Sequence, residues 1–171
     1  SLIQKSGARF VDLAEIGSYE DGFFNLEVFG KADRVVYLAA YLYHYRRDGS
    51  SSVTSGYNPR LYDQWQTLYD RMEVIIRSNQ LGSEYEAALN NRIALGILGL
   101  GLNITVSTQP MGKKVKDIHR IIRQERYRKA YKNLPLNYFP IHWKLFYGCA
   151  KHGFAFGVYV LLTVIQRIIS R

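Results

Sequence analysis

Cysteine and acidic residues are scarce in this sequence. It has one cysteine, Cys149, and 14 Asp and Glu residues against 23 Lys and Arg residues, a formal net charge of +9. A single cysteine cannot form an internal disulfide, which excludes a disulfide-stabilised scaffold and fits a reducing compartment. Hydrophobic residues make up 47% and charged residues 22%. This composition indicates a globular chain with a real core and excludes a disordered one.

We expect neither a secretory leader nor a clear membrane span in this sequence. It begins at Ser1 without a methionine or a charged-then-apolar leader, and we expect it to be a piece of a longer protein. The stretch between Arg92 and Lys113 carries no charge, but its second half is polar, so the apolar part is shorter than the roughly 20 residues of a span. A buried helix is the better interpretation of that stretch.

Positive charge is concentrated in one segment. Residues 110–133 contain nine basic and two acidic residues, and residues 134–171 add four basic residues. Such a segment favours contact with anionic lipid or nucleic acid. No nucleic-acid-binding fold signature accompanies it, so nucleic acid is an unlikely partner.

Helical periodicity dominates the chain after residue 57. Apolar residues recur at helical spacing, and Asn58-Pro59 provides a helix start signal. Gly96, Gly99 and Gly101 predict close packing against a neighbouring element, because their spacing does not match a nucleotide-binding loop. The predicted helices cover residues 20–32, 58–79, 83–102 and 113–132.

Two adjacent carboxylates, Glu20 and Asp21, open the first predicted helix. The free N–H groups and positive dipole end of a helix start favour carboxylates, which suits either a simple cap or a general base that must stay ionised. Val35 to Tyr45 is rich in β-branched and aromatic residues and predicts one or two strands.

These elements occur in an order that resembles a known family. An acidic pair at Glu20-Asp21 is followed by a V-x-Y-L pattern at Val35 to Leu38, an L-Y-x-Y-R pattern at Leu42 to Arg46, and Ser52-Val53-Thr54. The order resembles the C-terminal part of the catalytic domain in family-2 glycosyltransferases with the A-type nucleotide-sugar fold. The closest resemblance is to bacterial enzymes that build capsule, exopolysaccharide or lipopolysaccharide, and it covers roughly the first third of the chain.

The resemblance implies a reaction and a site. A sugar would pass from a nucleotide-diphosphate donor to a hydroxyl of a glycan or lipid-linked acceptor, with Asp21 as the base and Glu20 beside it. His44 would be a metal ligand or phosphate contact, and Arg46 would bind the diphosphate. The alternatives are an edge-strand histidine without a ligand and a solvated arginine. The family implies a divalent metal, Mn or Mg, but its Asp-x-Asp motif and nucleotide-binding region do not occur here.

We therefore expect a C-terminal fragment whose missing part holds the donor and the main metal ligands. The expected fold class is mainly α with a small α/β portion. The expected regions are the end of the catalytic domain (residues 1–56), a helical region (57–133) and an aromatic and basic amphipathic tail (134–171).

The aromatic and basic tail is typical of the headgroup level of a bilayer. The expected location is therefore cytoplasmic, peripheral on the inner face of the cell membrane. The alternative for the tail is packing into the domain or a partner. The alternative for the whole chain is a non-catalytic basic module that docks on an anionic membrane or on a partner protein.

Overall fold

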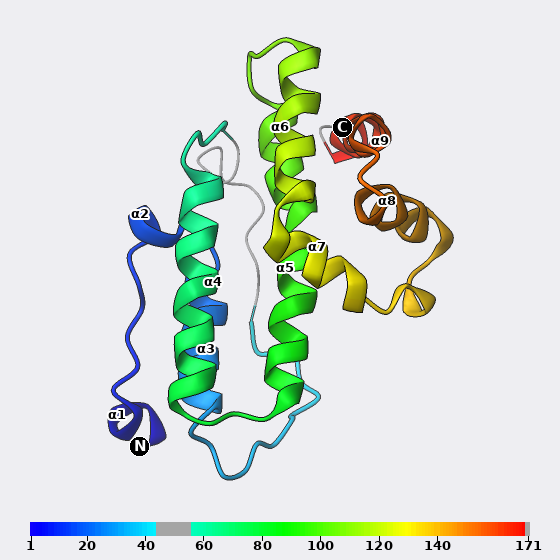
Figure 1. Ribbon diagram of the computed structural model, residues 1–171. Coiled ribbons are helices and arrows are strands. Elements are labelled where there is room, and N and C mark those ends of the chain that lie inside the picture. Colours follow the sequence, from blue (N-terminus) through cyan, green and yellow to red (C-terminus); the bar gives the residue numbers. More distant parts are fainter. Residues whose placement is uncertain (44–55, 170–171) are drawn as a thin grey trace.

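The computed structural model describes residues 1–43 and 56–169, and in these residues it is mainly helical and contains no strand. Figure 1 shows the helices in chain order. They are α1 (Leu2–Ser6), α2 (Leu13–Ile16), α3 (Glu20–Phe29), α4 (Leu61–Ser78), α5 (Ser83–Thr105), α6 (Met111–Arg123), α7 (Glu125–Asn133), the 3-10 turn η1 (Leu136–Tyr138), α8 (Ile141–Lys151) and α9 (Ala155–Ile169).

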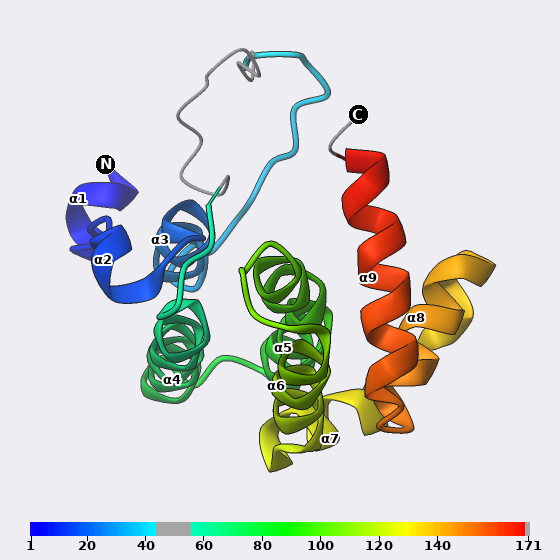
Figure 2. The same cartoon turned by 90° about the horizontal axis from the view of Figure 1, so that it is seen from above.

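Helix α5 is the centre of the arrangement. It packs against α4, α6, α7 and α9, while α2 and α3 pack against α4, and α8 packs against α9. Seen from above, α3 and α4 lie on one side of α5 and α9 lies on the other (Figure 2). In the described part of the chain, α5 is the helix long and apolar enough to cross a membrane by length and composition. Its contacts on several sides agree with the predicted buried helix.

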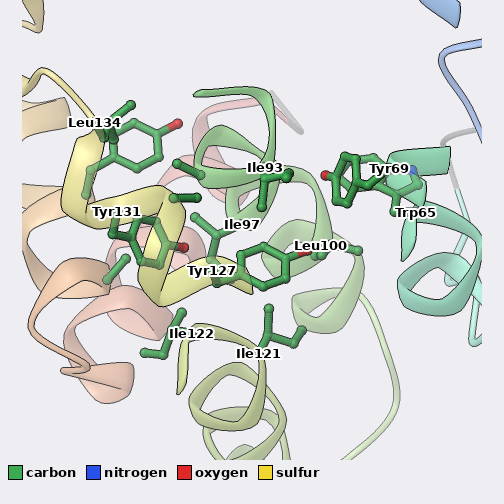
Figure 3. Close-up of a cluster of buried hydrophobic side chains, with 14 of the residues drawn as sticks. Trp65, Tyr69, Ile93, Ile97, Leu100, Ile121, Ile122, Tyr127, Tyr131 and Leu134 are labelled. Atoms are coloured by element: carbon green, nitrogen blue, oxygen red, sulfur yellow. The ribbon is translucent and has the colours of Figure 1, made fainter. Parts of the chain in front are cut away.

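Glycines let α4 and α5 approach closely. A Cβ atom added at Gly99 would lie 2.6 Å from the Trp65 ring, and one added at Gly96 would meet the Tyr69 hydroxyl. Both aromatic residues come from α4 and are buried. Figure 3 shows their rings on the side of Ile93 and Leu100 of α5. The close packing predicted from the glycines is therefore present.

The predicted helix over residues 113–132 is two helices, α6 and α7. They separate at Gln124, whose backbone is extended with φ −64° and ψ 146°. The Tyr62 hydroxyl donates a hydrogen bond to Gln124 Oε1, and Arg126 pairs with Asp70 and Glu73 of α4. Contacts with α4 thus hold α7 where a single straight helix would not place it.

Tyrosines form much of the core between α4, α7 and α8. Tyr69, Tyr127 and Tyr131 are fully buried, and Tyr147 of α8 is 3% exposed. Figure 3 shows the rings of Tyr127 and Tyr131 near Ile97 of α5. The buried cluster continues through Phe146 into α9, so one core joins all three regions expected from the sequence.

The strand predicted over Val35 to Tyr45 does not form in its described part, residues 35–43. Its large apolar side chains are highly exposed, from 62% at Val35 to 101% at Tyr41. A strand needs a neighbouring strand for its backbone hydrogen bonds, and the described residues supply none. A segment with strand-forming composition therefore has no strand to pair with here. The small α/β portion of the expected fold is not present in the part of the chain described.

The tail expected to be amphipathic packs into the core through one of its sides. Phe146, Tyr147 and Ala150 of α8 and Val158 and Leu162 of α9 are buried. A Cβ atom added at Gly101 of α5 would collide with the Leu162 side chain. The inner side of the tail therefore packs into the domain, as the alternative interpretation of the tail predicts.

We predict that Gly96→Ala destabilises the protein although alanine is the better helix former. The helix preference is worth about 1 kcal/mol, whereas forcing a methyl against the buried Tyr69 and Trp65 rings costs typically 1–3 kcal/mol. The matched control is Gly148→Ala in α8, where an added Cβ meets nothing within 4 Å. Urea unfolding should show a loss for the first variant and none for the second. Equal effects would contradict the close-packing account.

We also predict alkaline destabilisation. Burial raises the pKa of Tyr69 and of Tyr147 to about 12, and it raises the pKa of Tyr127 and Tyr131 above the ordinary 10.0. Below pH 10 these phenols keep their protons in both states, so their contribution to stability is constant. Above pH 10 the unfolded chain ionises first, and stability falls by up to about 1.4 kcal/mol per pH unit for each tyrosine.

Urea unfolding at a series of pH values on both sides of 10 measures this slope. Tyr147→Phe keeps the ring and removes one titrating group. The dependence of the unfolding free energy on pH should therefore become shallower by about the contribution of one tyrosine. A pH-independent free energy of unfolding through pH 12 would show that these hydroxyls reach water in the folded state.

Candidate functional site

The acidic pair lies in the first turn of α3, as the sequence predicts. Glu20 is half-buried and Asp21 is exposed. Asp21 Oδ1 accepts a hydrogen bond from the backbone N–H of Gly22 at 2.6 Å. Asp21 is thus accessible to a molecule in solution while its carboxylate is oriented by the backbone, which fits both a cap and a general base.

The residues just before the pair are fixed by α4 and α5. Tyr19 has a left-handed backbone with φ 73°, and its ring covers Gly22, where an added Cβ would collide with it. The Arg92 guanidinium lies 3.9 Å from the centre of the Tyr19 ring and 5.3 Å from that of Trp65. Trp65 Nε1 donates a hydrogen bond to Ser18 Oγ at 3.1 Å. Two side chains of the helical core therefore hold the start of α3.

A second set of hydrogen bonds fixes the preceding helix α2. Gln64 Nε2 of α4 donates to the Ala14 carbonyl at 3.0 Å, and its Oε1 accepts from Asn58 at 2.8 Å. Asn58 in turn exchanges two backbone hydrogen bonds with the Asn103 side chain of α5, at 2.7 and 2.8 Å. The ion pair between Arg71 and Glu15 adds a link at the surface. The segment leading to the acidic pair is thus attached to α4 over several turns.

A cavity of about 130 Å³ lies behind the start of α3. Its walls are mostly apolar, and Arg92 supplies its cationic group. Its lining comes from three helices and the residue before α3: Tyr19, Gly22, Leu26, Met72, Ile76, Tyr85, Ala88, Leu89 and Arg92. Neither Glu20 nor Asp21 lines it, so the acidic pair is not part of this cavity.

Two predicted site residues, His44 and Arg46, lie outside the described residues. In the described ranges, 1–43 and 56–169, no group of three or more His, Cys, Asp or Glu side chains could hold a metal ion. The part of the site that the structure describes therefore consists of the acidic pair and its supports.

Arg92, Trp65 and Ser18 were not predicted from the sequence as part of the site. Arg92 has a visible signal, because it is the one charged residue between Glu86 and Lys113. A lone cation in an apolar helix needs a specific partner, and here the partners are two aromatic rings. The hydrogen bond between Trp65 and Ser18 joins residues 47 positions apart and has no local signal.

No protein-family model, curated protein or solved structure gives a significant match to this chain. Its site is therefore interpreted from its own residues and their geometry.

We predict that the Arg92 contact stabilises the start of α3. Arg92→Met keeps much of the apolar stem and removes the cation over the Tyr19 and Trp65 rings, which should cost about 1 kcal/mol. The control is Arg77→Met on α4. It removes an ion pair between the exposed Arg77 side chain and Glu73, and such a surface pair contributes little to stability. Urea unfolding should separate the two variants. If both lose the same stability, the stacking does not support α3.

Proposed function

We propose that this chain is the C-terminal part of a family-2 glycosyltransferase of the bacterial surface-polysaccharide type. It would act in transfer of a sugar from a nucleotide-diphosphate sugar to a hydroxyl of a glycan or lipid-linked acceptor. The observation that carries the proposal is the acidic pair Glu20-Asp21, which opens a helix whose start is fixed by Trp65 and Arg92. A catalytic base must be held in place and stay accessible, and Asp21 meets both requirements.

In this proposal Asp21 accepts the proton of the acceptor hydroxyl. The hydroxyl oxygen then forms a bond to the anomeric carbon of the sugar as the bond to the nucleotide diphosphate breaks. Glu20, half-buried beside Asp21, orients the acceptor or the loop. The free N–H groups at the start of α3 favour the ionised form of these carboxylates.

The exposed apolar segment at residues 35–43 supports the finer assignment of fold. Tyr37, Leu42 and Tyr43 are 89%, 78% and 81% exposed, and the segment has strand-forming composition. Large apolar side chains left in solvent indicate a surface that another element covers. We propose that this segment pairs with the sheet of the donor-binding portion, and that residues 1–56 complete an A-type glycosyltransferase domain.

His44 and Arg46 would lie at the donor diphosphate, where a guanidinium forms bidentate hydrogen bonds to phosphate oxygens. The Mn or Mg ion that the family implies does not fit the described residues, which contain no cluster of ligands.

A second candidate function is a non-catalytic basic module that docks on an anionic membrane or a partner protein. The observation in its favour is the charge of α6 and α7, most of whose basic residues are exposed. It leaves the fixed acidic pair without a role, so substitution of that pair distinguishes the two functions.

The test is Asp21→Asn in the polypeptide that carries both this chain and the donor-binding portion. Loss of a general base lowers turnover by a factor of about 10² to 10⁴, while donor binding should be retained because a base acts mainly in the transition state. Glu20→Gln should have a smaller, acceptor-dependent effect. Sugar transfer and equilibrium binding of the nucleotide-sugar are measured for each variant.

Glu27→Gln, which removes a carboxylate from the same helix, is the matched control. It should leave turnover near that of the unmodified protein. Near-normal turnover of Asp21→Asn with a matched donor and acceptor would show that the pair serves only as a helix cap. Equal losses in Asp21→Asn and Glu27→Gln would show a general charge effect instead of a base.

A further inference from the structure

Helix α9 is apolar over most of its surface. Between Lys151 and Arg167 the chain contains no Asp, Glu, Lys or Arg. Its inner side, with Ala155, Val158 and Leu162, is buried against the bundle. At 100° per residue, the opposite side presents four residues at a spacing of four. These residues, the outer face of α9, are Phe156, Val160, Val164 and Ile168.

The outer face of α9 is open to solvent. Its four side chains are between 43% and 69% exposed. At the start of the helix the rings of Phe154 and Phe156 lie 6.5 Å apart, and Phe154 is itself 57% exposed. Figure 2 shows α9 at the side of the bundle away from α3 and α4. A contiguous exposed row of this kind on a folded protein marks an interaction surface.

Basic residues predominate in the sequence around this surface. From Arg126 to the last residue, Arg171, the sequence contains eight basic residues and no Asp or Glu. Lys151 lies three residues before the exposed Phe154, and Arg167 lies in the last turn of α9. Cations at both ends of an apolar helix, with aromatic rings beside them, match the layering of an anionic bilayer surface.

We infer that the outer face of α9 binds the surface of an anionic phospholipid bilayer. Phe156 to Ile168 covers about 18 Å along the helix axis, which is shorter than the hydrocarbon core of about 30 Å. The helix therefore lies in the interface, with its inner side still on the bundle. The inference goes beyond the proposed transferase activity and does not depend on it.

The charge also argues against a second copy as the occupant. In a two-fold dimer the same patch meets itself, which would bring together two surfaces with an excess of basic residues. Like charges at an interface oppose association, whereas anionic headgroups favour it. Lipid is therefore the partner whose chemistry fits both the apolar row and its cationic ends.

The test uses flotation with vesicles of phosphatidylglycerol mixed with phosphatidylcholine, and with phosphatidylcholine alone. The protein should float with the anionic vesicles and float poorly with the neutral ones. High salt should weaken its binding to the anionic vesicles without abolishing it. Val160→Ser with Val164→Ser should lower partitioning at least tenfold, because the inserted apolar area is lost. Lys151→Gln should lower it about fivefold, and only at low salt.

Val74→Ser on α4, which is 64% exposed, is the matched control and should float like the unmodified protein. Thermal melting and light scattering accompany each variant. Retained flotation of the α9 double variant would overturn the inference, as would absence of flotation in the unmodified protein. A concentration-dependent dimer that the double variant abolishes, without lipid binding, would assign the face to a second copy and also overturn it.

Discussion

The packing of Trp65 and Tyr69 on the glycine side of α5 is the contact on which most of the structure depends. It sets how closely α4 and α5 approach, and α5 then receives α6, α7 and α9 on its other sides. Trp65 also donates the hydrogen bond that holds Ser18 before α3. The same side chain therefore belongs to the core and to the support of the acidic pair, so a change that loosens the core at Gly96 would also move the candidate base.

The positions of α3, α4 and α5 and the glycine contact could be predicted from local patterns, because apolar spacing and missing side chains are properties of the sequence itself. The break at Gln124 could not be, since neither Gly nor Pro marks it. It follows from bonds to Tyr62 and from the pairing of Arg126 with α4. Residues 35–43 show the opposite case, in which strand propensity is plain but no neighbouring strand lies in the described residues.

The candidate site likewise has a part that the sequence predicts and a part that it does not. The position of Glu20 and Asp21 at a helix start could be predicted, because a carboxylate before an apolar helical pattern is a local signal. Their supports could not, because Arg92 and Trp65 reach Tyr19 and Ser18 across the fold. Under the proposed function, this support of Tyr19 and Ser18 is what favours a base over a simple cap, since a solvated cap needs no anchoring by the core. The contacts across the fold thus supply information about the site that the helical pattern of the sequence does not contain.

Helix α9 has two roles on opposite sides, and this explains why the tail cannot be treated as a detachable anchor. Val158 and Leu162 belong to the core that includes Tyr131 and Phe146, so deleting the tail would expose that core as well as remove the outer face. Helix α5 lies between α9 and the side of the bundle that carries α3 (Figure 2). Helix axes pack 8–10 Å apart, so with α9 in the lipid interface Asp21 would stand at least about 10 Å from it. Under the proposed transferase function, such a distance favours the glycan end of a lipid-linked acceptor over its lipid end as the group that would meet Asp21.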